Sequence, residues 1–491
     1  MGRATGALPV RPTVGIDPGP VPARCGHRRA TGAGPLTKRM WSERAMLERW
    51  WKRAMLFAAC VAWVTPLQGQ TPSGDVLRLS LDEAIRLALQ NHLQVLLARE
   101  AIQEARGRRS LAQSALMPHL TSAAYQADLT ANLAAMGLGP KKIPGLDPFV
   151  GPFSRFDARL QLVQSIFNLA AVRRYQAAAR ALSLARVQEQ SAEQQIIVAT
   201  ALAYIAALEA EQEVQAARAD LELARRLFEL AQHSRQVGVA TGVDVARAET
   251  HLAAQEVRLA QARTDLETAQ LNLLRLIGAP LSSQLQLTDA LRLASEAPPS
   301  LEEALGRAWS ERLELKAAEE QLKIAQLERQ AALASWLPSI SFFGDYGSSA
   351  IRPLETSLPT RSIGLRLDFP VFDGGRTRSE IQISASRLRQ AELRLKDLRA
   401  AIEKEVREAH ANLQTRREQV EAARKAVELA ERELEMAQDR FRNGVASNIE
   451  VINAQAALEN ARKGWIQSLA LYNVARLNLA AAMGRPEDFR L

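Results

Sequence analysis

The stretch RQVGVATGVDVARAET, residues 235–250, interrupts a long helical segment, and a near copy, RNGVASNIEVINAQ, follows at residues 442–455. An offset of 206 residues places Gly238 over Gly444, and the same offset aligns Gly278 with Gly484. Because helix breakers are sparse on both sides, each glycine-containing break predicts a turn between two helices. The repetition indicates that the chain contains the same structural unit twice.

Other segments repeat in the same order. LSLDEAIRLAL at 79–89 matches PSLEEALGRAW at 299–309, and LQLVQSIFNLAAVRR at 160–174 matches LRLDFPVFDGGRTRS at 365–379. The offset changes from 220 to 205 between these matches, so the first copy carries fifteen additional residues between Pro118 and Phe167. Insertions of this kind belong in exposed loops. We therefore predict one repeat over 79–278, a connector over 279–300 and a second repeat over 301–486.

Each repeat is predicted to run helix, strand, loop, strand, long helix, turn, helix. Ser80 and Ser300 are suitable N-caps, each with a glutamate three residues later, which is a capping box. The first helix of each repeat should continue to the residue before Pro118 or Pro338, because proline disfavours helix at the preceding position. The turns between the last two helices, the hairpin tips, are expected at about 233–244 and 441–450.

The two longest helices are predicted over about 170–232 and 375–440. At 1.5 Å per residue each is on the order of 90–100 Å long. Apolar and small residues recur along both at heptad spacing, which is typical of closely packed, supercoiled helices. By length, 244–277 and 301–335 together match one long helix, as do 449–483 and 81–116. We expect these pairs to stack end to end, with the connector at mid-height.

Four strands are predicted, at about 118–128, 154–166, 338–347 and 361–371. The segments SRFDARLQLVQ (154–164) and RSIGLRLDF (361–369) alternate apolar and polar residues. Such alternation suits barrel strands that face lipid outside and water inside, although a small sandwich on a coiled coil would show it too. Four strands cannot close a barrel, so insertion into a membrane requires two chains (eight strands) or three chains (twelve). The predicted fold class is mainly α with a small β part: an α-barrel of long coiled-coil-like helices joined to a transmembrane β-barrel closed by oligomerisation.

The first 70 residues predict a removable extension and export signal. Basic residues up to Arg53 precede an apolar run, Ala54–Val64, and then small and polar residues, which is the order of a signal peptide. The residues upstream are rich in Pro, Gly and Arg, as a start codon placed too early would produce, and Cys60 leaves lipidation open. Residues 1–53 hold eleven Lys or Arg against three acids and account for +8 of the net charge of +9. The remaining chain is nearly neutral, which argues against a nucleic-acid partner. No run of 18 apolar residues follows, so we expect no transmembrane helix in the mature chain.

In this order the segments resemble the TolC-like outer-membrane efflux protein family, the outer membrane factors. The resemblance rests on the duplicated SLDEAIRLAL and SLEEALGRAW starts, the strands entered at Pro118 and Pro338, the exits SIFNLAAVRR and PVFDGGRTRS, and the paired turns. The first copy departs at Asn168-Leu169-Ala170, where DGG would be expected, so this exit should turn less sharply.

The resemblance implies a homotrimer in the outer membrane of a Gram-negative-type bacterium, with a twelve-stranded barrel that continues into a periplasmic helical barrel. It implies the exit duct of a tripartite efflux or type I secretion system. Its partners would be outer-membrane lipid, a periplasmic membrane-fusion adaptor and an inner-membrane transporter. The family's tip turns contact the adaptor and close the periplasmic end.

The candidate functional residues lie at the turns and on the strands. Asp244 and Glu450 occupy matching positions in the first turn of a returning helix, where a carboxylate suits the helix N-terminus, and they are also candidates for an acidic ring around an aperture. The glycines serve helix reversal or docking, and both interpretations stay open. The adaptor-docking candidates are Gly238, Val239, Thr241, Asp244, Gly444, Val445, Ser447 and Glu450. The barrel-lumen candidates are Asp157, Arg159, Arg366 and Asp368.

The sequence offers no signature of an enzyme. Its six histidines are scattered, no Gly-rich phosphate loop follows a strand, and no nucleophile is grouped with a base, so neither a cofactor nor a metal is predicted. The competing hypothesis is an exported coiled-coil spacer without a pore. The alternating strands and the loop insertion favour the duct, because a spacer needs neither.

Overall fold

The computed structural model describes residues 76–135, 137, 147–238, 240–294, 298–353, 357–443 and 445–491. The predicted N-terminal extension and export signal, with Cys25 and Cys60, lie outside the described residues. The described residues form one compact unit.

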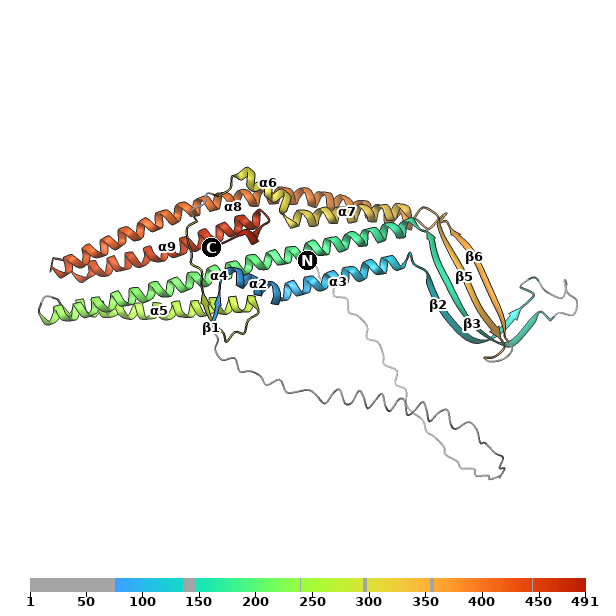
Figure 1. Ribbon diagram of the computed structural model, residues 1–491, viewed down its shortest axis with the longest axis horizontal. Coiled ribbons are helices and arrows are strands. Elements are labelled where there is room, and N and C mark those ends of the chain that lie inside the picture. Colours follow the sequence, from blue (N-terminus) through green and yellow to red (C-terminus); the bar gives the residue numbers. More distant parts are fainter. Residues whose placement is uncertain are drawn as a thin grey trace, which may run out of the picture. The chain divides into compact units, whose positions relative to one another are not determined.

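Long helices dominate this unit, and four strands extend from one end of it (Figure 1). The first repeat contains β1 (Val76–Leu79), α2 (Leu81–Asn91), α3 (Leu93–Ser114), β2 (His119–Asn132), β3 (Phe149–Phe167), α4 (Leu169–Gln236) and α5 (Gly242–Ile277). The second contains β4 (Gln284–Leu287), α6 (Leu301–Glu311), α7 (Leu313–Ala334), β5 (Ser339–Ala350), β6 (Leu358–Asp368), α8 (Arg376–Arg442), α9 (Asn448–Ala482) and the short helix η1 (Pro486–Asp488).

The four long strands form one antiparallel sheet in the order β2-β3-β5-β6. This agrees with the predicted mainly helical class with four strands. The strands of the first repeat are longer than predicted, because β2 continues to Asn132 and β3 already begins at Phe149. The additional residues of the first copy therefore lie partly in paired strand, not only in a loop.

The long helices α4 and α8 have 68 and 67 residues, which corresponds to about 100 Å each. The heptad positions pack as predicted: Ala224, Ala231, Ala430 and Leu434 are all buried. Small residues at these positions let the helices approach closely. The predicted capping boxes at Ser80 and Ser300 are also present.

The end-to-end stacking of the shorter helices differs from the prediction. Gly278, at the end of α5, lies against Asn91, and the Asn91 side-chain amide donates to the Ile277 carbonyl at 3.1 Å. The end of α5 therefore meets the junction of α2 and α3 within the first repeat, and the end of α9 meets the junction of α6 and α7 within the second (Figure 1). The expectation that 244–277 stacks on 301–335, and 449–483 on 81–116, was wrong. Helix length could not decide it, because α3 and α7 both have 22 residues.

The first helix of each repeat is also interrupted, which the sequence did not indicate. His92 (φ −71°, ψ 130°) separates α2 from α3, and Arg312 (φ −57°, ψ 119°) separates α6 from α7. At the first break, Nδ1 of His92 accepts from the backbone N–H of Gln94 at 3.2 Å. At the second break, the Arg312 guanidinium donates to the carbonyls of Ala481 and Ala482 at the end of α9. The breaks make room for the ends of α5 and α9, and Arg312 caps the Ala482 carbonyl, one of the last carbonyls of α9.

Gly484 is required at the second of these contacts. It has φ +86°, and a Cβ atom there would lie 2.9 Å from the Glu311 carbonyl carbon. We expect Gly484→Ala to destabilise the protein by about 1–3 kcal/mol, through backbone strain and this clash. Gly306→Ala is the matched control, because that helical position has nothing within 4 Å, and it should stabilise by up to about 1 kcal/mol. Thermal unfolding in detergent would check both, and a Gly484→Ala protein that melts at or above the wild-type temperature would contradict this.

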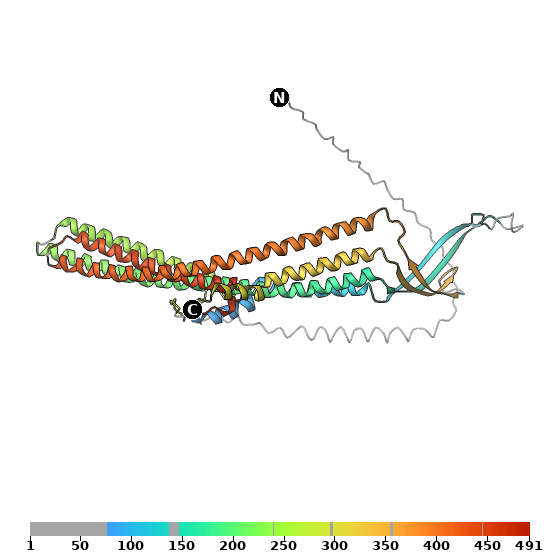
Figure 2. The same ribbon diagram turned by 90° about the horizontal axis from the view of Figure 1, so that it is seen from above.

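The main core lies at mid-height, where the two repeats meet. Short strands β1 and β4 pair in parallel there, a pairing the sequence did not indicate, and in Figure 2 the segment that carries them lies on one side of the helical layer. The fully buried Tyr204 hydroxyl lies 2.9 Å from both the Leu79 carbonyl and the Asp289 carboxylate. Among the described residues α4 alone contains an 18-residue window apolar enough to span a membrane, with mean hydropathy 1.3. Because 44% of that window is buried inside the protein, it also has the character of a core helix.

Candidate functional site: the sheet faces and the hairpin tips

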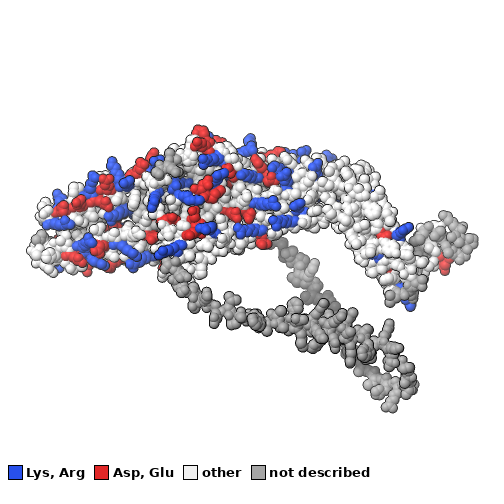
Figure 3. All heavy atoms as spheres, in the orientation of Figure 1, with Lys and Arg blue, Asp and Glu red and all other residues white. Residues whose placement is uncertain are grey.

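One face of the sheet presents apolar side chains to the surroundings. The register places Leu162 opposite Gly344 and Ile363, with Leu365 and Leu367 farther along β6 on the same face. The three β6 residues are 71%, 68% and 66% exposed. Figure 3 shows the sheet as a mostly uncharged region next to the charged helices. So much exposed apolar surface is costly in water and is suited to lipid.

The opposite face carries a network of charged residues. Asp157 is fully buried and accepts from Arg155 at 2.9 Å, from Ser349 at 2.9 Å and from Arg159 at 2.6 Å. Arg159 also donates to Asp345 at 2.9 Å. The charges within this group balance, so the network provides polarity and rigidity on this face.

The other two lumen candidates lie on the same face of the sheet. Ser341 pairs with both Ser165 and Arg366, and Ser339 pairs with Asp368, which gives these residues the same orientation as Asp157. The Arg366 guanidinium lies 5.5 Å from the centre of the Phe343 ring. The structure thus brings all four candidates to one side of the sheet, and their role in a lumen stays a prediction.

The first hairpin tip joins α4 to α5. Gly238 has φ +78°, and its surroundings are open. Thr241 is the N-cap of α5 and forms a capping box with Asp244, whose carboxylate accepts from the Thr241 backbone N–H at 2.9 Å. These hydrogen bonds hold the pKa of Asp244 below its ordinary value, so its carboxylate is charged at neutral pH. Val239 lies outside the described residues.

The second tip joins α8 to α9 and is built differently. Ser447 is the N-cap of α9 but makes no capping hydrogen bond through its side chain. Glu450 pairs with Arg440 across the turn at 3.1 Å. Val445 is 68% exposed, and Gly444 lies outside the described residues.

The two tips are joined by a residue that the sequence did not single out. Asn448 is fully buried, and its side-chain amide donates to the Asp244 carbonyl at 2.7 Å. The same two tips carry four exposed apolar side chains: Val237, Val243, Val445 and Ile449. The tips are therefore linked by a polar contact and present exposed apolar side chains.

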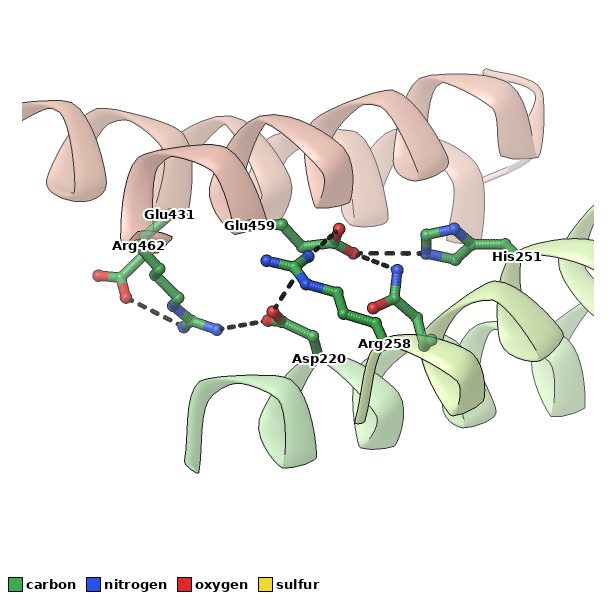
Figure 4. Close-up of polar contacts among 7 residues, drawn as sticks. Asp220, His251, Arg258, Glu431, Glu459 and Arg462 are labelled. Atoms are coloured by element: carbon green, nitrogen blue, oxygen red, sulfur yellow. Dashed lines mark hydrogen bonds and ion pairs between the residues drawn. The ribbon is translucent and has the colours of Figure 1, made fainter. Parts of the chain in front are cut away.

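A network of ion pairs links the two hairpins farther from the tips (Figure 4). Arg258 of α5 reaches Glu459 of α9 at 2.7 Å, and Arg462 of α9 reaches Asp220 of α4 at 3.2 Å. His251 Nε2 lies 3.8 Å from Glu459. The remaining members are Gln255, which donates to Glu459, and Glu431, which pairs with Arg462.

Burial dominates the electrostatics of this network. The Asp220 side chain is 2% exposed and that of Glu459 12%. Burial raises the pKa of both carboxyls above their ordinary values, although Arg462 and Arg258 act in the opposite direction. The charged network is therefore held in place by its arginines, and removal of one would leave a carboxylate poorly solvated.

Sequence reasoning missed this network because it relied on what the two repeats share. The offset of 206 places Ala426 over Asp220, Ala457 over His251 and Gly464 over Arg258. In reverse, Ala253 lies over Glu459 and Glu256 over Arg462. The sequence did contain one signal for this network: polar residues occupy helix-packing positions in one repeat and not in the other. Among the described residues, no group of His, Cys, Asp and Glu is arranged to hold a metal ion.

A sheet with an exposed apolar face, joined to helices about 100 Å long with exposed tips, defines the class of membrane-channel subunits. Comparison with known families is more specific. The chain belongs to the outer membrane efflux protein family, whose model matches residues 84–279 and 304–485. The two matched segments correspond to the two repeats.

Individual relatives cover most of the chain. The alkaline protease secretion protein AprF of Pseudomonas aeruginosa is 24% identical over 396 residues, which cover 79% of this chain and 80% of AprF. The protein CyaE of Bordetella pertussis is 29% identical over 439 residues, with 87% and 88% covered. The outer membrane protein VceC of Vibrio cholerae has the same fold, with a TM-score of 0.71 at 20% identity over 82% of this chain and 96% of that one.

Proposed function

We propose that this chain is one subunit of an outer-membrane exit duct, through which substrates leave the cell without any chemistry by the protein itself. Family membership supports this proposal, and the exposed apolar face of the sheet is the observation that carries it. The chain is an export channel and not an enzyme. The competing coiled-coil spacer would have no use for a row of side chains that are two-thirds exposed and apolar.

The duct is a homotrimer in the outer membrane and extends into the periplasm. The strand order leaves β2 and β6 as open edges, and unpaired backbone groups are not tolerated in lipid. Because β2 and β6 run in opposite directions, the β6 edge of one copy can pair antiparallel with the β2 edge of the next. Three copies then bring twelve strands, the number that the family resemblance implies.

The tips are the docking site of a periplasmic membrane-fusion adaptor in a tripartite efflux or type I secretion system, with an inner-membrane transporter behind it. The exposed Val237, Val243, Val445 and Ile449 support this, because apolar side chains at the end of a helical hairpin suit another helical hairpin. The relative AprF is by name a secretion protein.

Channel recordings test the proposal. Protein extracted from the outer membrane and added to a planar bilayer should give discrete conductance steps. A preparation that inserts and never conducts, or one found only as a soluble periplasmic monomer, would contradict the duct.

The acidic residues of the tips give a second result in the same assay. Three copies would place six carboxylates, from Asp244 and Glu450, around one opening. Asp244→Asn with Glu450→Gln should lower the ratio of cation to anion permeability by about twofold or more, because fixed charge at a constriction selects ions. Glu222→Gln with Glu428→Gln is the matched control, since these acids pair with arginines on exposed helix faces away from the tips. Equal selectivity in both variants and the wild type would exclude the acidic ring.

A further inference from the structure

Arginines gather where all four helices join the sheet. Within about two turns of the strands there are seven arginines and three acids, Glu328, Asp373 and Glu380. The seven residues, which we call the arginine collar, are Arg108 and Arg109 on α3, Arg173 and Arg174 on α4, Arg329 on α7, and Arg376 and Arg378 on α8. Figure 3 shows basic side chains gathered on the helices beside the uncharged region of the sheet.

The protein neutralises few of these charges. Arg108 pairs with Glu104, and Arg376 pairs with Glu380 at 3.0 Å. Arg109 contacts the hydroxyl and the ring face of Tyr175. Across the part of the chain that the structure describes, no carboxylate pairs with Arg109, Arg173, Arg174, Arg329 or Arg378. Such a concentration of like charge is costly unless an anion covers it.

A ledge of exposed apolar residues lies directly beside the collar. Phe372 is 87% exposed, Val371 81% and Phe369 59% at the exit of β6, and Trp336 is 43% exposed where α7 leads into β5. Aromatic side chains at the end of membrane strands occupy the level of the lipid headgroups. The collar begins within about 10 Å of this ledge, because a helix rises 1.5 Å per residue.

We propose that the arginine collar binds anionic phospholipid headgroups of the periplasmic leaflet. The inference rests on the proposed insertion of the sheet into the outer membrane. Arginine rather than lysine occupies all seven positions, and a guanidinium can donate two parallel hydrogen bonds to one phosphate. The collar thereby fixes the depth of the duct in the bilayer, since displacement along its axis would separate arginines from phosphates.

Quenching of tryptophan fluorescence tests this. Trimers are reconstituted in two kinds of phosphatidylcholine vesicle. In one, about 20 mol% of the lipid is phosphatidylglycerol with brominated chains, and in the other the same fraction is phosphatidylcholine with brominated chains. Bromine quenches tryptophan fluorescence on contact, so Trp336 reports which lipid lies beside the collar. We expect phosphatidylglycerol to associate at least about fivefold more strongly, the effect of one basic residue at an anionic surface. The ratio of phosphatidylglycerol association to phosphatidylcholine association should fall towards one in about 0.5 M salt, where charges are screened.

Matched variants locate the effect. One variant should abolish the preference for phosphatidylglycerol, namely the variant in which Gln replaces Arg173, Arg174, Arg329 and Arg378. The control variant changes four other arginines to Gln: Arg218, Arg247, Arg263 and Arg424. These arginines are exposed, have no described ion pair and lie in the hairpins. The control variant should retain the preference for phosphatidylglycerol. Equal association of both lipids with the wild type, or equal loss in both variants, would overturn the inference. Flotation of the same vesicles separates the two proposals: protein that fails to insert contradicts the duct itself, whereas inserted protein without lipid preference contradicts only the collar.

Discussion

Ile363→Arg is expected to remove the protein from the outer membrane almost completely. Ile363 is 71% exposed and lies in β6 between Arg361 and Leu367, near the middle of the apolar face. A charge near the bilayer midplane of a membrane barrel costs about 2–4 kcal/mol, and a trimer would incur this cost three times. The amount of protein in purified outer membranes, compared with total synthesis, measures the loss.

Ser362→Arg is the control for this substitution. Ser362 is the adjacent residue, pairs with Asp345 and faces the polar side of the same strand. We expect this variant to insert at close to the wild-type level, because its charge enters water. If both variants insert equally well, the apolar face does not contact lipid.

Arg462→Ala is expected to destabilise the packed hairpins by about 3 kcal/mol. It leaves the Asp220 carboxylate, 2% exposed, with Arg258 at 3.9 Å as its nearest remaining cation. Breaking a buried ion pair from one side is costly because the remaining charge loses its solvation, and the partial exposure of Arg462 limits the effect to the lower part of the usual range. Thermal unfolding in detergent, followed by helical circular dichroism, would report it.

A second substitution should restore the stability that Arg462→Ala removes. Ala426 occupies the position of Asp220 in the other repeat, so Asp220→Ala has a precedent within this fold. We expect Arg462→Ala combined with Asp220→Ala to melt close to the wild type. A double variant as unstable as Arg462→Ala would show that the arginine acts through packing and not through charge.

The same network predicts how stability changes with pH. Burial raises the pKa of Asp220 and Glu459, so the folded protein holds protons at pH values where the unfolded chain has released them. The resulting stability is complete below the ordinary carboxyl range near pH 4 and is lost as the pH rises through the raised values. Asp220→Ala should therefore flatten the decline in melting temperature between about pH 4 and neutrality.

Much of the fold could be predicted because the sequence contains two copies of the same structural unit. The paired glycine turns, the capping boxes at Ser80 and Ser300 and the heptads of α4 and α8 each follow from local rules. The breaks at His92 and Arg312 could not be predicted, because neither residue is a helix breaker and the cause lies in the ends of α5 and α9. The stacking of helices within each repeat could not be predicted either, since equal helix lengths permit stacking within a repeat or between the two repeats.

The candidate site was predictable only in part, for the same reason. Alternation along β3 and β6 indicated that Asp157, Arg159, Arg366 and Asp368 share one face of the sheet. The link between the tips through Asn448 depends on two segments that are 204 residues apart. Contacts of this kind are set by the packing of one repeat on the other, which no local pattern records.

Disulfide scanning across the open sheet edges tests the central claim most directly. Cysteine at Ala123 in β2 is combined in turn with cysteine at Thr360, Ser362 or Gly364 in β6, on the polar face. After oxidation in outer membranes, at least one pair should give covalent dimers and trimers on a non-reducing gel, and nothing larger. Monomers alone for every pair, or a ladder that continues beyond three chains, would contradict a closed barrel built from three copies of this sheet.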